Sequence, residues 1–227
     1  MGKINEKSLT LIEAKPVFVF GLFGLIASII VGAGEFLVHY SANGYRGADN
    51  FTWLKDISPS VAVVGHVLMI MGMPLYIFGY YHIYLCLQTG HKVLSKLVLV
   101  LGIVAFMTAA IWAGSRLMLI EIVKLGDQHL IDFYKSHYEI LVQVLRVLIF
   151  FISALWVYII ISTKTIYPKW MAVVNPILIL GVVFGVYFLV PSIGSFLVPT
   201  AMNVTHLIVF TFSLHTSINS TRYENKF

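Results

Sequence analysis

Six long apolar stretches divide this chain of 227 residues, and short polar segments separate them. A helix needs about 20 consecutive apolar residues to cross a bilayer, and each stretch reaches that length. The sequence therefore predicts an all-α fold: a six-transmembrane-helix bundle that forms a single membrane domain over residues 1–227. The predicted spans are approximately 16–40, 58–87, 95–124, 138–162, 171–190 and 196–218.

The composition favours a membrane protein over a soluble one. Hydrophobic residues make up 59% of the chain and charged residues 11%, with a mean hydropathy of +0.90, whereas soluble domains carry about 25% charged residues. The net charge of +5 comes mostly from the ends of the apolar stretches, where topology signals lie. We therefore expect the lipid bilayer as a partner and no nucleic acid. The single cysteine, Cys86, excludes an internal disulfide.

Lysine and arginine residues are shared unequally between the two predicted faces of the membrane. The face that holds both termini carries nine: Lys3, Lys7, Lys15, Lys92, Lys96, Lys164, Lys169, Arg222 and Lys226. The opposite face carries four: Arg46, Lys55, Lys124 and Lys135. Cytoplasmic loops are enriched in these residues, so we expect both termini in the cytoplasm.

Polar side chains inside the predicted spans gather at one depth. At about 1.5 Å of rise per helical residue, six of them lie about 8–15 Å below the non-cytoplasmic face: Glu35, His66, Gln143, Arg146, Asn203 and His206. Such groups are costly in hydrocarbon and usually face protein or trapped water. Their convergence predicts one polar cavity that opens towards the non-cytoplasmic side.

The third and fourth predicted spans carry charged residues that could pair with Glu35. A buried carboxylate must be protonated, paired or hydrated. Spacings of four and three place Glu139, Gln143 and Arg146 along one helical face. We favour Glu35 and Arg146 as the charged pair of the cavity, because Arg116 lies near the outer interface and could extend to water. Arg146 could instead clamp an anion with its planar fork of donors.

Small residues form a second pattern, on the first predicted span. They recur at three- and four-residue spacing, which predicts a seam where another helix approaches closely. These residues are Gly21, Gly24, Ser28 and Gly32. Gly181 and Gly185 on the fifth span are expected to pack in the same way.

Three kinds of site could use the polar residues. Glu35, His66 and His206 would supply two nitrogens and one oxygen, the ligand count of a catalytic zinc with an open position, although no His-x-x-x-His pair supports a metal. His66 and His206 could also be the axial ligands of a haem. A cavity that binds protons or a ligand needs the fewest assumptions, and the sequence identifies no cofactor.

A group of residues in the first two spans resembles known sequences. The residues are Gly34-Glu35, Ser58-Pro59-Ser60, Gly65, Gly72, Pro74-Leu75-Tyr76, Gly79 and Tyr81-His82-Ile83-Tyr84. They resemble uncharacterised bacterial multi-pass membrane proteins that are grouped as domains of unknown function. In those proteins an acidic residue often follows glycine in the first span, as Glu35 does here. The resemblance implies a protein of the bacterial inner (plasma) membrane and no particular activity.

Our leading hypothesis is a protein that binds or transports a small molecule or lipid in a polar cavity near the outer leaflet. The candidate ligand-binding or proton-relay residues are Glu35, His66, Arg116, Glu139, Gln143, Arg146, Asn203 and His206. One alternative is a membrane-embedded enzyme for a lipid-soluble substrate, with a metal on Glu35, His66 and His206. Another is a structural or assembly subunit, which predicts a fully paired network without a ligand-sized void. No catalytic residue is assigned, and the sequence leaves homo-oligomer formation open.

Overall fold

The computed structural model describes residues 6–41 and 51–224, with side chains described for residues 16–41 and 51–218. This part of the chain is helical and contains no strand. The α-helices are α1 (Glu6–His39), α2 (Pro59–Leu125), α3 (Gln128–Ser162), α4 (Pro176–Leu189), α5 (Pro191–Leu197) and α6 (Ala201–Glu224). Short 3-10 helices lie between them: η1 (Thr52–Asp56), η2 (Lys169–Val173) and η3 (Val198–Thr200). Lys3, Arg46 and Lys226, which contribute to the predicted charge asymmetry, lie outside the described residues.

Four of the described helical segments are long and apolar enough to cross a membrane. They are Pro16–His39, Pro59–Leu125, Gln128–Ser162 and Pro191–Ile218, and the shorter Pro176–Leu189 is also apolar. Many large apolar side chains on these segments face outwards, Met71, Met107 and Phe188 among them, as a hydrocarbon environment requires. The chain is therefore an all-helical integral membrane protein, and the predicted all-α class is confirmed.

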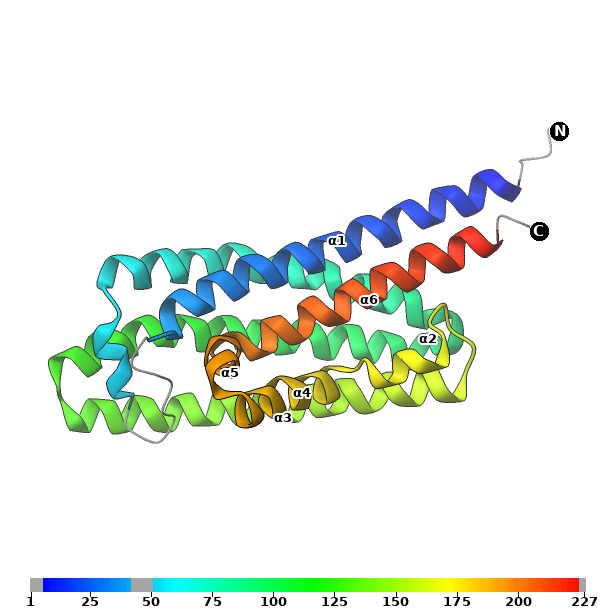
Figure 1. The fold of residues 1–227 in the computed structure, drawn as a ribbon. Coiled ribbons are helices and arrows are strands. Elements are labelled where there is room, and N and C mark those ends of the chain that lie inside the picture. Colours follow the sequence, from blue (N-terminus) through cyan, green and yellow to red (C-terminus); the bar gives the residue numbers. More distant parts are fainter. Residues whose placement is uncertain (1–5, 42–50, 225–227) are drawn as a thin grey trace.

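Helix α2 folds back on itself at His91. This residue has φ −152° and ψ 90°, outside the helical region, inside a segment that is otherwise helical over 67 residues. The two legs of α2 then run side by side in opposite directions (Figure 1), and the rings of Tyr76 and Phe106 stack across them with centroids 3.7 Å apart. This reversal lies in the gap between the spans predicted over 58–87 and 95–124, and it needs only one non-helical residue.

Glycines allow α1 to approach the first leg of α2 closely. A Cβ atom on Gly24 would lie 2.8 Å from the Cα of Gly79, and one on Gly34 would lie 2.5 Å from the carbonyl oxygen of Gly65. These neighbours are backbone atoms that no rotamer change can move. The predicted small-residue seam on the first span is confirmed at Gly24, and it continues to Gly34. On α4, however, Gly181 and Gly185 have nothing within 4 Å, so their predicted packing role is wrong.

Polar side chains fix where the helices begin and end. Ser58, Asp127 and Asn175 each accept a hydrogen bond from a backbone N–H in the first turn of α2, α3 and α4, which satisfies a donor that has no partner within the helix. At the other end of α3, Lys169 Nζ donates to the carbonyl oxygens of Ile160, Ile161 and Thr163 at 2.6–2.8 Å. A cation there also complements the negative end of the helix dipole.

The C-terminal third differs from the two simple spans that we predicted over 171–190 and 196–218. Helix α4 has only 14 residues, and residues 191–194, which lie between the two predicted spans, form the start of α5. Gly194 packs directly on the backbone of Tyr187. The chain reverses direction between α4 and α6, at α5. Figure 1 shows that α5 lies within the bundle, short of the end reached by α2 and α3. As a result α6 starts deeper among the other helices than the sequence suggested.

Candidate functional site

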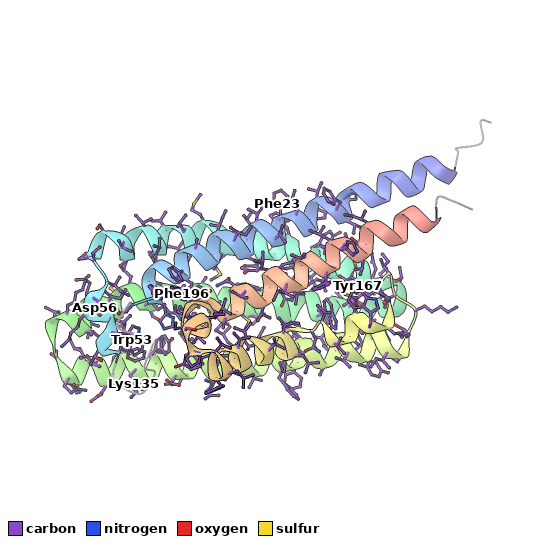
Figure 2. All side chains as sticks on the ribbon, viewed as in Figure 1. Phe23, Trp53, Asp56, Lys135, Tyr167 and Phe196 are labelled. Carbon is purple, nitrogen blue, oxygen red and sulfur yellow. The ribbon has the colours of Figure 1, made fainter. Side chains whose placement is uncertain are left out.

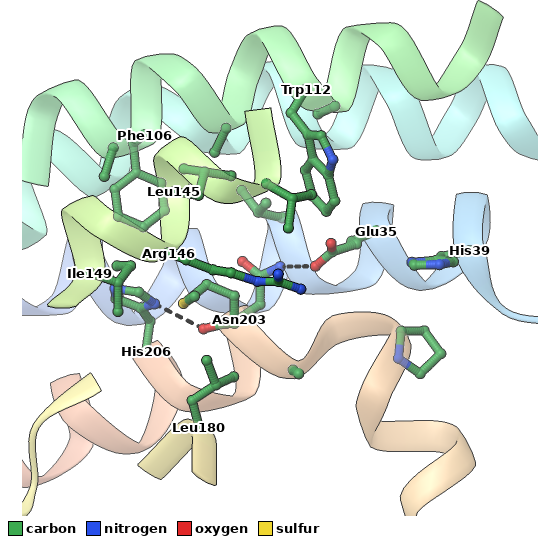
Figure 3. A pocket seen from close by; sticks show the side chains of 18 of the residues that line it. Glu35, His39, Phe106, Trp112, Leu145, Arg146, Ile149, Leu180, Asn203 and His206 are labelled. Atoms are coloured by element: carbon green, nitrogen blue, oxygen red, sulfur yellow. Dashed lines mark hydrogen bonds between the residues drawn. The ribbon is translucent and has the colours of Figure 1, made fainter. Parts of the chain in front are cut away.

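A cavity of about 390 Å³ lies between α1, α2, α3, α4 and α6. Its walls are mostly apolar, with Met69, Phe106 and Ile149 among the lining side chains. Ionisable and amide groups enter it from several helices (Figure 3). Cavities of this volume and composition, with a few convergent polar groups, are typical of small-molecule sites.

An ion pair in the wall joins α1 to α2. Arg116 Nη1 lies 3.2 Å from Glu35 Oε1, and the two side chains are only 5% and 7% exposed. The guanidinium carbon also lies 3.5 Å from the ring centroid of Trp112, and Nη2 donates to the hydroxyl of Tyr138 at 3.3 Å. Arg116 is thereby held by a carboxylate, an aromatic face and a hydroxyl.

Asn203 of α6 joins this pair to the first leg of α2. Its amide nitrogen donates to Glu35 Oε2 at 2.5 Å, and its amide oxygen accepts from the hydroxyl of Tyr76 at 2.6 Å. A carboxylate can only accept, so the amide nitrogen must face Glu35 and the oxygen is left for Tyr76. The buried carboxylate therefore has a partner for each of its oxygens.

His206 lies one turn further along α6 and also lines the cavity. Its Nδ1 lies 2.8 Å from the carbonyl oxygen of Met202, and its Nε2 lies 3.0 Å from the hydroxyl of Tyr80. Because a carbonyl oxygen only accepts, the hydrogen of the neutral ring is on Nδ1, and Nε2 accepts from Tyr80. Phe106 packs edge-on against the same ring, with centroids 5.1 Å apart.

Helix α3 contributes two charged residues that are exposed as well as cavity-lining, Glu139 and Arg146. In Figure 3 the Arg146 side chain extends from α3 into the cavity towards Asn203. Within the described residues, no carboxylate lies within 4.0 Å of its guanidinium. Arg146 is thus a cation that points into the cavity and is not neutralised by a neighbouring side chain.

The structure brings six of the eight predicted site residues to one cavity. These are Glu35, Arg116, Glu139, Arg146, Asn203 and His206. Gln143 is exposed and does not line the cavity, and neither does His66, whose Cε1 lies 3.9 Å from the position of a Cβ on Gly114. A role for the six in ligand binding or proton transfer remains a prediction.

Two geometric expectations about these residues are wrong. Glu35 pairs with Arg116 and not with Arg146, because Arg116 is buried beside Glu35 whereas Arg146 lies at an exposed position of α3. His206 does not face His66: it contacts Tyr80, which lies 14 residues beyond His66 on the same helical leg, about 21 Å along the axis. The deep start of α6 accounts for this displacement.

The separation of His66 and His206 argues against the metal and haem sites that were considered for them. The predicted ligand set of Glu35, His66 and His206 is not gathered in one place, and no group of three or more His, Cys, Asp or Glu side chains among the described residues could hold a metal ion. His66 and His206 also do not face each other across a space at one depth, as two axial ligands of a haem would.

Four residues that contribute to this site were not predicted from the sequence. Tyr76 and Tyr80 do not line the cavity but hold two residues that do, Asn203 and His206, while His39 and Tyr138 line it directly. A signal for the first two was available, because a fully buried tyrosine in a membrane helix needs a hydrogen-bond partner. Their i, i+4 spacing also places both hydroxyls on one face.

A second polar cluster lies towards the opposite end of the bundle and is tightly packed. His82 Nδ1 donates to the carbonyl oxygen of Val17 at 2.7 Å, and its Nε2 accepts from the hydroxyl of Ser213 at 2.6 Å. Ser213 Oγ also lies 2.5 Å from the hydroxyl of Tyr167. These side chains are buried and do not line the cavity, so the cluster ties α1, α2, α6 and the loop before η2 together.

The fold and the cavity define the class of this protein: an all-helical integral membrane protein whose helices enclose a mostly apolar cavity with charged groups in its wall. The chain belongs to the family of unknown function DUF6796, whose model matches residues 13–220. This match covers far more of the chain than the first two spans, which carried the resemblance described above. No curated protein and no solved structure matched the chain.

Proposed function

We propose that this protein binds a small molecule or lipid in the cavity and either retains it or carries it across the membrane. In this proposal the chain forms one membrane domain that crosses the membrane six times. Each leg of α2 makes one crossing, and α4 makes another together with η2, the 3-10 helix before it. The excess of Lys and Arg on the side of the termini supports cytoplasmic termini. The membrane would be the bacterial inner membrane.

The observation that carries the proposal is the buried Glu35–Arg116 pair in the wall of a cavity of about 390 Å³. Taking two charges out of water costs several kcal/mol per ion before their attraction is counted. Apolar side chains could join the helices without that cost. An ion pair that serves only to hold helices together is therefore expected in a closely packed core, away from any cavity. Here the pair, with Asn203 and His206, lies beside space that a ligand can fill.

The second polar cluster provides a comparison within the same molecule. Around His82, Ser213 and Tyr167 the hydrogen-bonding groups satisfy one another, and these side chains do not line the cavity. That is the arrangement expected of a structural network. The wall around Glu35 differs from it in facing the cavity and in including Arg146, which no carboxylate of the described part of the chain neutralises.

Native mass spectrometry of the full chain in a mild non-ionic detergent tests the proposal. Wild-type protein incubated with the lipid extract of its expression host is expected to carry added mass that is released on activation. Ala109→Trp, which fills the cavity from α2, should lose this mass. Ala154→Trp, a control on an exposed position of α3, should keep it.

Two results would contradict the proposal. One is wild-type protein that carries no added mass. The other is an A109W variant that is more stable than the wild type and retains the same bound mass, because the cavity would then be a void without a ligand.

A further inference from the structure

Exposure of the lining side chains shows where the cavity opens. The lining residues of α1, α2 and α6 are buried or half-buried, whereas the exposed ones come only from α3 and α4. They are Glu139 and Arg146 on α3, and Ile177 and Phe184 on α4. Among the described residues, the opening of the cavity therefore lies between α3 and α4.

Away from the exposed polar residues Glu139, Gln143 and Arg146, the surface beside this opening is apolar. Val147 and Phe150 of α3 are 53% and 57% exposed, and Leu178 and Val182 of α4 are 50% and 62% exposed. A hydrogen bond from the backbone nitrogen of Ile177 to Ser153 Oγ (3.1 Å) joins the two helices at the start of α4. Because the exposed side chains around the opening suit hydrocarbon, the cavity communicates with the lipid phase.

Helix η1 and the preceding Phe51 cover the end of the cavity that lies near His39 and Tyr138. The ring of Phe51 lies 5.2 Å from that of Tyr138, and Trp53 stacks on His39 at 6.0 Å. Phe51 and Trp53 are themselves buried, and Figure 2 shows Trp53 at the end of the bundle opposite Tyr167.

Contacts with the helices hold η1 in place. Lys124 Nζ donates to the carbonyl oxygen of Ile57, and Ser41 Oγ donates to Asp56 Oδ2 at 2.9 Å. Direct access from water at this end is therefore blocked by packed aromatic side chains, whereas the side facing the lipid is open.

The charges in the wall indicate which headgroup would fit. Glu35 neutralises Arg116, so Arg116 has little charge to offer a ligand. Arg146 points into the cavity beside the opening (Figure 3), and Glu139 lies seven residues earlier on the same helix, about 10.5 Å along its axis. A guanidinium binds carboxylate or phosphate oxygens in bidentate geometry.

We infer that the ligand is an amphiphile with an acidic headgroup, a carboxylate or a phosphate, which enters from the bilayer between α3 and α4. Its headgroup binds Arg146, and its acyl chain occupies the apolar part of the cavity along Ile149, Leu180 and Phe184. This inference rests on the proposed function, because it specifies the ligand class and the route of entry for the same cavity.

Quenching of tryptophan fluorescence by a brominated fatty acid tests the headgroup. Trp112 lines the cavity, so the difference in quenching between wild type and W112F reports occupancy. The full chain in nanodiscs of phosphatidylcholine is titrated with dibromostearate at about pH 9, where the free carboxyl is ionised, and with its neutral methyl ester. A brominated lysophosphatidic acid provides the phosphate headgroup.

The acid and the lysophosphatidic acid are expected to quench Trp112 at concentrations about tenfold below those needed for the ester. Arg146→Gln should weaken binding of both acids by about tenfold and leave the ester unchanged. Lys96→Gln, which removes an exposed charge of α2 outside the cavity, is the matched control and should bind like the wild type.

The route of entry has its own pair of variants. Leu180→Trp narrows the opening from α4, and Leu178→Trp adds the same bulk at an exposed position that does not line the cavity. L180W should slow the quenching of Trp112 by dibromostearate at least about fivefold, while L178W should not. Equal rates in both variants would overturn entry between α3 and α4.

The remaining outcomes separate the two proposals. Equal affinity for acid and ester, or an R146Q variant that binds both acids like the wild type, overturns the acidic headgroup while the bound mass in native spectra still supports a ligand cavity. Quenching relieved by acetate or inorganic phosphate overturns the amphiphile in favour of a water-soluble anion. Absence of Trp112 quenching together with absence of bound mass overturns both proposals.

Discussion

Arg116 Nη1 and Glu35 Oε1 lie 3.2 Å apart on two different helices, and neither side chain is more than 7% exposed. The carboxylate is further fixed by Asn203 of α6, and the guanidinium by Tyr138 of α3. A charged group at this depth is therefore shared among four helices. Changes at any member of the set should affect the stability of the bundle as well as the cavity.

Removing the negative charge should be strongly destabilising. Glu35→Gln leaves the Arg116 cation buried without a counter-charge, which costs about 3–5 kcal/mol. The loss is measured by unfolding in mixed detergent micelles. The double variant Glu35→Gln, Arg116→Met removes both charges and should recover more than half of it. An E35Q protein as stable as the wild type would show that the pair is not ionised in the bundle.

Asn203 should stabilise the fold through its hydrogen bonds to Tyr76 and Glu35. Asn203→Ala leaves the Tyr76 hydroxyl and one Glu35 oxygen without their hydrogen bonds, and we expect a loss of about 2–4 kcal/mol in the free energy of unfolding. Tyr76→Phe removes only the hydroxyl and should cost about 1 kcal/mol. The same unfolding assay checks both, and a Y76F loss as large as that of N203A would contradict this division.

The close approach of α1 to α2 predicts a sharp contrast between two glycines. Gly24→Ala places a Cβ 2.8 Å from the Cα of Gly79, and separating the helices should cost about 1–3 kcal/mol. Gly185→Ala on α4 meets nothing within 4 Å and should be neutral or stabilise the helix by up to about 1 kcal/mol. Midpoints of thermal unfolding measured side by side test the pair. Equal effects would show that the seam does not limit the distance between the helices.

Stability at alkaline pH should depend on Tyr167, which lies in the loop between α3 and η2. Burial raises the pKa of Tyr167 well above its usual value, so the folded protein keeps a proton that the unfolded chain loses at about pH 10. The stabilisation is complete below that pH and is lost as the pH rises further, by up to about 1.4 kcal/mol per pH unit.

The comparison for this residue is Tyr167→Phe. Without the hydroxyl, the slope of stability against pH above about pH 10 should become shallower by up to the same amount. At neutral pH the variant should lose about 1 kcal/mol, because Ser213 loses a partner. Unfolding curves collected from neutral to alkaline pH measure both effects, and an unchanged alkaline slope would show that Tyr167 ionises freely in the folded state.

The sequence by itself determined the helical class, the break between the spans predicted over 58–87 and 95–124, and the residues that are too polar for lipid. Length and hydropathy define apolar helices because the bilayer demands them, and periodicity assigns Glu35, Arg146, Asn203 and His206 to particular faces of their own helices. That information was sufficient to predict a cavity whose wall carries these four residues.

Only the tertiary structure decided which faces meet. Periodicity does not fix how far one helix is shifted or rotated against another, and these shifts depend on packing between distant segments, such as Gly24 on Gly79. Packing brought Arg116 rather than Arg146 to Glu35. The reversal at α5 moved His206 away from the level of His66 and beside Tyr80. Helix α4 likewise begins only at Pro176, five residues after the predicted start of the fifth span at residue 171, because Lys169–Val173 form the 3-10 helix η2, a difference that no hydropathy pattern marks.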